Sequence, residues 1–137
     1  MPSPELVAMI VSTLATHLAL AGESFAKELG KAASAKVGDL YKAVKERFAK
    51  EKENKNAPQI IEEFERKPDE WVGPMKSTLM SIMSNDPDFS AHLEKLVNET
   101  KEESRKAGTE NNFETMVTGG YVGKITNIGT IEGNVDL

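Results

Sequence analysis

The sequence predicts an all-α protein: a small bundle of four to five helices followed by a C-terminal tail rich in glycine, asparagine and isoleucine. Through the first three quarters of the chain, apolar residues recur at spacings of three and four, the period of an amphipathic helix. All six prolines lie at or before Pro87, and six of the ten glycines lie at or after Gly108. We therefore divide the chain into a helical bundle over residues 1–105 and a tail over residues 106–137 that is disordered or β-forming.

Composition narrows the classes of function. The 137 residues suffice for about one domain, and the net charge of −5 argues against nucleic acid as a partner. The chain has no cysteine, which excludes disulfides and thiolate metal ligands. His17 and His92 lack the spacing of a metal site, and no serine lies in the G-x-S-x-G pattern of a nucleophile. We therefore expect no enzyme activity, catalytic residue, metal or cofactor.

The first expected helix is apolar on all sides and begins near Pro4, with Ser3 as its N-cap. Residues 6–22 include no Asp, Glu, Lys or Arg, and their number is close to the roughly 20 that a membrane-spanning helix needs. No basic n-region precedes them, so we expect a cytoplasmic chain rather than a secreted one. Two interpretations stay open: the central helix of a resting bundle, and a helix that acts on a membrane when released. The side chains expected to act on the membrane are Leu6, Val7, Ile10, Val11, Leu14 and Leu18.

Four further amphipathic segments complete the expected bundle. They are residues 34–52, residues 58–66, a segment that begins at Trp71 or at Gly73-Pro74, and residues 87–106. Asp86 is the expected N-cap of the last segment, with Pro87 in its first helical position. The methionines at 75, 80 and 83, together with Trp71, are most simply core residues.

The tail has a different pattern, in which β-branched residues alternate with glycine and asparagine. Apolar residues recur every third position from Val122 to Ile131, and no proline follows Pro87. Low charge, no proline and β-branched residues favour cross-β stacking, and the glycines favour a solenoid-like rung with turns. A flexible end or a small hairpin packed on the bundle is the other interpretation. The residues expected to carry assembly are Ile125, Asn127, Ile128, Gly129, Ile131, Gly133, Asn134 and Val135.

Five segments and the tail carry a resemblance to a known family. The segments are the uncharged residues 6–22, the small-residue stretch GESFAKELGKAASAK (22–36), DLYKAVKERF (39–48), EEFERKPDEW (62–71) and SNDPDFSAHLEKL (84–96). Behind them, Asn127-Ile128-Gly129 is distantly similar to the polar–aliphatic–glycine core of RHIM-type motifs, with Asn127 where those motifs usually have Gln. In this order the chain resembles the bacterial Bell-type, HeLo-like cell-death effectors that end in a bacterial amyloid signalling motif.

The resemblance implies a non-enzymatic effector of programmed cell death in bacterial immunity. A sensor protein with a matching motif would template the tail into a prion-like fibril, and the clustered bundles would permeabilise a membrane through the N-terminal helix. The implied partners are further copies of the chain, the sensor and membrane lipid, with a move from cytoplasm to membrane on activation. One alternative is an adaptor, whose tail recruits and whose bundle binds a protein without touching lipid. A small enzyme or ligand-binding bundle is a second alternative.

Overall fold

The computed structural model describes residues 3–20 and 22–118. Within these ranges the chain forms seven α-helices and no strand, which confirms the all-α prediction for this part of the chain. The helices are α1 (Pro4–Ala19), α2 (Gly22–Leu29), α3 (Lys31–Ala49), α4 (Ala57–Arg66), α5 (Val72–Asn85), α6 (Pro87–Lys106) and α7 (Glu110–Val117). The predicted count of four to five helices is wrong.

Two local features explain the additional helices. In the sequence, apolar residues at spacings of three and four continue from Val7 as far as Phe25, but Leu20 has extended backbone angles (φ −94°, ψ 141°) and separates α1 from α2. Gly30 then takes a positive φ of 92° between α2 and α3, so the second expected helix begins at Lys31 rather than near residue 34. Helix α7 lies in residues that the sequence analysis assigned to the tail.

The expected helix starts at two prolines are confirmed. Ser3 Oγ accepts a hydrogen bond from the Leu6 backbone N at 3.1 Å, and Pro4 lies in the first turn of α1. An N-cap side chain of this kind satisfies one of the free N–H groups at the start of a helix. Asp86 caps α6 in the same way, with Pro87 in the first turn.

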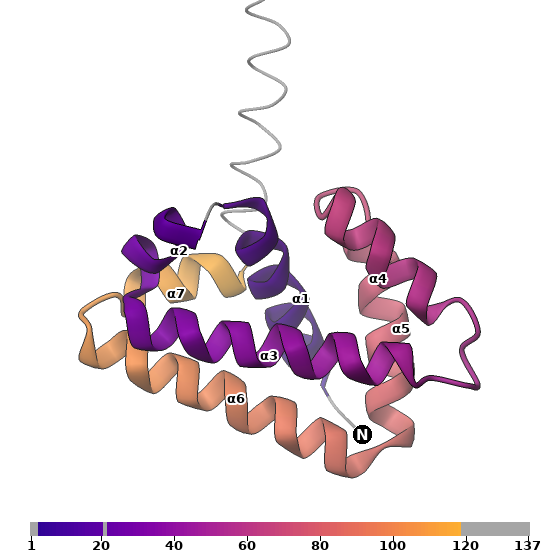
Figure 1. The fold of residues 1–137 in the computed structure, drawn as a ribbon. Coiled ribbons are helices and arrows are strands. Elements are labelled where there is room, and N and C mark those ends of the chain that lie inside the picture. Colours follow the sequence, from indigo (N-terminus) through magenta and orange to yellow (C-terminus); the bar gives the residue numbers. More distant parts are fainter. Residues whose placement is uncertain (1–2, 21, 119–137) are drawn as a thin grey trace, which may run out of the picture.

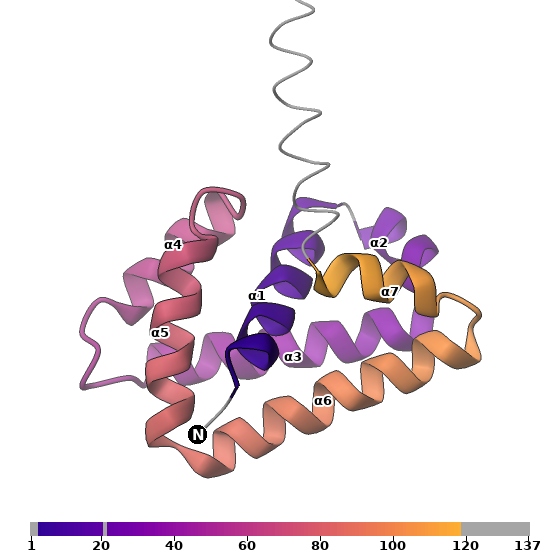
Figure 2. The same cartoon turned by 180° about the vertical axis from the view of Figure 1, so that it is seen from behind.

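The helices surround α1 (Figure 1). Helices α3 and α6 lie side by side, α4 and α5 lie at one end of them, and α2 and α7 lie at the other (Figures 1 and 2). Helix α1 contacts each of the other six helices. The expectation of a central helix in a resting bundle therefore describes the position of α1.

The core is largely aliphatic, with aromatic and sulfur-containing side chains from many helices among its largest members. Four phenylalanines are fully buried, each on a different helix: Phe25, Phe48, Phe64 and Phe113. Met75 and Met83 are buried among them, and Trp71 and Met80 are half-buried against the same core. This agrees with the assignment of those four residues to the core.

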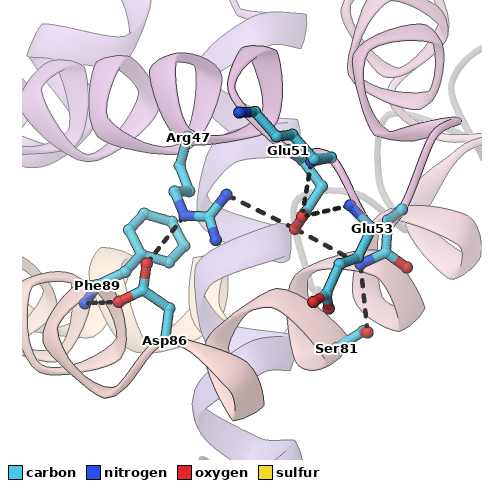
Figure 3. Close-up of polar contacts among 8 residues, drawn as sticks. Arg47, Glu51, Glu53, Ser81, Asp86 and Phe89 are labelled. Atoms are coloured by element: carbon cyan, nitrogen blue, oxygen red, sulfur yellow. Dashed lines mark hydrogen bonds and ion pairs between the residues drawn. The ribbon is translucent and has the colours of Figure 1, made fainter.

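A polar cluster joins the end of α3 to the corner between α5 and α6 (Figure 3). Arg47 Nε donates to Asp86 Oδ2 at 2.9 Å, and Asp86 Oδ1 accepts the Phe89 backbone N–H at 3.1 Å. Both hydrogen bonds stabilise the ionised carboxylate and lower the pKa of Asp86. Arg47 also pairs with Glu51 at 3.6 Å, and the Glu51 carboxylate accepts the backbone N–H of Glu53. The cluster fixes where α6 begins relative to α3.

Replacing the capping carboxylate tests this corner. We expect Asp86→Ala to lower the free energy of unfolding by about 1–2 kcal/mol, because it removes the N-cap and the Arg47 partner together. The loss should shrink as pH falls below about 4, since the lowered pKa of Asp86 means that its contribution is present above the usual pKa and disappears as the folded carboxyl protonates. Urea unfolding at several pH values measures both effects.

Asp88→Ala is the matched control, because Asp88 is exposed in the same helical turn. It should change stability by less than about 0.5 kcal/mol. Equal losses for the two variants would show that the cluster contributes nothing specific.

Candidate functional site

Helix α1 carries the six side chains assigned to membrane action, and it holds them inside the bundle. Leu6 and Leu18 are half-buried against the core. The other four are at most 2% exposed: Val7, Ile10, Val11 and Leu14. In the described arrangement, therefore, most of the apolar surface of α1 faces protein.

Two threonine side chains of α1 form their hydrogen bonds within the helix itself. Thr13 Oγ1 donates to the Met9 carbonyl oxygen at 2.7 Å, and Thr16 Oγ1 donates to the Ser12 carbonyl oxygen at 3.0 Å. Across residues 3–20 and 22–118, no side chain of α1 forms a hydrogen bond or ion pair with another helix. Within the described part of the chain, apolar packing and ring contacts hold α1 in place.

The length of α1 limits how it can meet a bilayer. Its 16 residues give a helix about 24 Å long, against about 30 Å for the hydrocarbon core of a membrane. Among the helices of the described ranges, none combines the length and the apolar character that crossing a membrane requires.

His17 lies at the C-terminal end of α1, between α2 and α3. Its ring centroid is 4.9 Å from that of Phe25, in an edge-on arrangement, and 5.8 Å from that of Tyr41. Its Nδ1 atom is buried without a hydrogen-bond partner, and burial lowers the pKa of His17. Behind it, the Tyr41 hydroxyl donates to Glu65 on α4, which also pairs with Lys45 at 3.0 Å. Burial and the Glu65 carboxylate raise the pKa of Tyr41.

Helix α7 packs against α1 and is anchored to the end of α2. Its Phe113 and Met116 side chains are buried in the core. Asn112 Nδ2 donates to the Glu28 carbonyl oxygen at 2.8 Å, and Thr109 Oγ1 donates to the Leu29 carbonyl oxygen at 2.6 Å. The last carbonyls of a helix lack partners within it, so these two side chains complete the C-terminus of α2.

The turns beside this anchor are also closely packed. A Cβ atom on Gly30 would lie 2.9 Å from Ala107 Cβ, at a φ of +92° that other residues rarely adopt. The turn between α2 and α3 therefore fits directly against the turn between α6 and α7. The sequence analysis missed this site; the apolar spacing of Phe113 and Met116 was its one available signal.

The remaining candidate residues are those of the tail and His92. The eight tail residues assigned to assembly, within 125–135, lie outside the described residues. His92 is exposed on α6, and the described part of the chain has no cluster of three His, Cys, Asp or Glu side chains that could hold a metal ion.

Comparison of the chain with protein-family models, curated proteins and solved structures finds no match. The assignment of function therefore depends on the residues of this chain.

The half-buried His17 predicts a pH dependence of stability. Because burial lowers the pKa of His17, the unfolded chain binds a proton there more readily than the folded one. The stabilising contribution is complete above the unfolded pKa of about 6.5 and is lost as pH falls from that value through the lowered one. We expect the free energy of unfolding to fall on acidification from pH 7.5 to 5.5, by at most about 1.4 kcal/mol per pH unit for one proton.

Urea unfolding across that pH range, with His17→Leu beside the wild type, measures this dependence. The variant should show the shallower slope, because it cannot take up the proton. His92→Gln, altered at an exposed position of α6, should keep the wild-type slope. Parallel curves for wild type and His17→Leu would exclude His17 as the cause.

Proposed function

We propose that this chain is a non-enzymatic cell-death effector of the bacterial Bell-type, HeLo-like kind. The tail after α7 assembles into a cross-β fibril, templated by a sensor protein with a matching motif, and the clustered bundles then permeabilise a membrane through α1. The observation that carries this proposal is the position of α7, which packs on α1 and leads directly into the tail.

Steric crowding connects assembly of the tail to α7. Chains in a cross-β stack are spaced about 4.8 Å apart, whereas a folded domain of this size is roughly 30 Å across. Between Val117 and the first assembly residue, Ile125, the seven linking residues reach at most about 25 Å. Neighbouring bundles therefore compete for the same space along a fibril. The strain falls first on α7, the helix nearest to the tail.

Moving α1 from the bundle into water costs a large free energy, whereas moving it from the bundle into lipid costs little. Full burial of an aliphatic side chain contributes about 1.5–3 kcal/mol, so the four buried ones on α1 together contribute about 6–12 kcal/mol. This is comparable to the whole stability of a typical domain. Hydrocarbon offers the same side chains an equivalent environment. Because the Thr13 and Thr16 hydroxyls bond within the helix, α1 leaves the bundle without breaking a side-chain polar contact to another helix.

The mode of membrane damage follows from the length of α1. A helix of about 24 Å enters a bilayer by thinning it locally or by lying near the interface. One copy disturbs lipid little, but a fibril presents many copies side by side. Clustering of short helices is therefore the source of permeability in this proposal.

An adaptor is the second candidate, and the burial of α1 favours it. With most of its apolar surface covered by the described helices, α1 also suits a rigid core helix that never leaves the bundle. In that case the tail recruits, and an exposed helix face binds a protein partner.

Assembly through the tail is tested on the full chain. Preformed fibrils should seed soluble protein into fibrils whose diffraction shows the cross-β spacings of about 4.7 Å and about 10 Å. Ile128→Pro should abolish seeding, because proline cannot donate to the stacked backbone bonds, whereas Ile128→Leu should keep it. Wild-type protein that stays monomeric with seeds at high concentration would refute assembly.

The α7 anchor is tested by removing its side-chain hydrogen bonds. We expect the double variant Thr109→Val/Asn112→Ala to destabilise α7 by about 1–3 kcal/mol and to raise hydrogen exchange in α7 and α2. Seeded leakage of vesicles should then begin at a lower protein concentration than for wild type. Thr115→Ala, at an exposed position of the same helix, is the control. Faster exchange without easier leakage would separate α7 from the release of α1.

A fluorophore on α1 separates the effector from the adaptor. The chain has no cysteine, so Ala19→Cys, at the exposed end of α1, gives one site for an environment-sensitive dye. With seeds and anionic vesicles, an effector should show a blue shift at this site together with leakage. Ala91→Cys, exposed on α6, is the matched control and should show neither a shift nor altered leakage. Recruitment to fibrils without either signal at residue 19 would favour the adaptor.

A further inference from the structure

A groove lies between α1, the start of α5 and the end of α7. Its volume is about 540 Å³, within the range of pockets that accept organic groups. The apolar side chains of Ala8, Met9, Val72 and Val117 line it, and so does Thr118, where the described chain ends. Figure 2 shows α7 running up to α1 and ending beside it. The described chain therefore ends at the groove, at Thr118.

The sequence after Thr118 fits a return into this groove. Gly119 and Gly120 follow directly, and glycine takes either sign of φ, so the chain can reverse there. The first apolar side chains are then Tyr121 and Val122, and three residues reach about 10 Å from Thr118.

The groove carries one charged side chain of each sign. Glu5, which is exposed, contributes a carboxylate, and Lys76 contributes an ammonium group. Lys124, two residues beyond Val122, is the only basic residue in 119–137. With Tyr121 and Val122 in the groove, the Lys124 ammonium comes within reach of that carboxylate.

We propose that Tyr121 and Val122 dock in the groove between α1, α5 and α7 of their own chain. A tether this short gives an effective concentration in the millimolar range, so a contact of millimolar Kd is already substantially occupied. The docked pair covers the exposed edge of Met9 and Val72 and holds the end of α7 on α1. The assembly residues from Ile125 onward stay outside the contact. This docking takes place within one chain, so it is tested independently of fibril formation.

The test is nuclear magnetic resonance on the full chain, at a concentration where sedimentation shows a monomer. In the wild type, the Tyr121 ring should show nuclear Overhauser contacts to the methyl groups of Met9 and Val72. Tyr121→Ser/Val122→Ser should remove these contacts and shift the backbone amide signals of Ala8, Met9 and Val72. Val135→Ser/Leu137→Ser makes the same kind of change farther along the tail and should leave those signals in place.

The docking proposal requires both the contacts in the wild type and their loss in Tyr121→Ser/Val122→Ser. Missing contacts in the wild type, or equal amide shifts in the two double variants, would overturn it. Contacts that weaken on dilution would identify a second copy of the chain as the occupant and would overturn it as well. The wild-type measurement needs no variant to fold. Seeding of fibrils, measured separately, reports on the proposed function alone.

Discussion

The structure depends on the apolar packing of α1. All six other helices contact this helix, and they bury four of its aliphatic side chains almost completely. The Thr13 and Thr16 hydroxyls donate to backbone carbonyls of the same helix, and among the described residues no side-chain hydrogen bond or ion pair joins α1 to another helix. Burial of apolar surface is non-directional, and it does not distinguish a protein interior from hydrocarbon. The same packing that makes α1 the centre of the resting bundle is thus compatible with a second apolar environment.

Directional contacts lie at the periphery of the bundle instead. At one end, Arg47 and Asp86 join α3 to the α5–α6 corner, and at the other, Thr109 and Asn112 join α7 to the last carbonyls of α2. Hydrogen bonds of this kind contribute little net free energy but fix geometry. The polar contacts therefore determine where the outer helices lie, and α1 occupies the space that they enclose. A substitution in either set of contacts therefore alters the packing of the outer helices around α1 without altering α1 itself.

The sequence was sufficient to predict features with local causes. Ser3 and Asp86 cap helices because a short polar side chain precedes a proline, and both appear in the structure. The end of α1 at Leu20 has no such marker, since apolar spacing continues across it to Phe25. Helix α7 has only eight residues and depends on contacts with α1 and α2 that are distant in sequence. An apolar helix has the same sequence pattern in a protein core and in a bilayer. The sequence alone therefore did not decide which of the two surrounds α1.

The close fit of Gly30 against Ala107 makes α2 and α7 mutually dependent. Each has eight residues, too few for a helix to persist alone in water. Thr109 and Asn112 donate hydrogen bonds to the last carbonyls of α2, and the turn after α2 packs against the turn before α7. The pair should therefore open and close as one cooperative unit. Opening it would remove Phe25 from the His17 ring at the same moment as Phe113 from the core, so α1 would lose two of its covers in a single event.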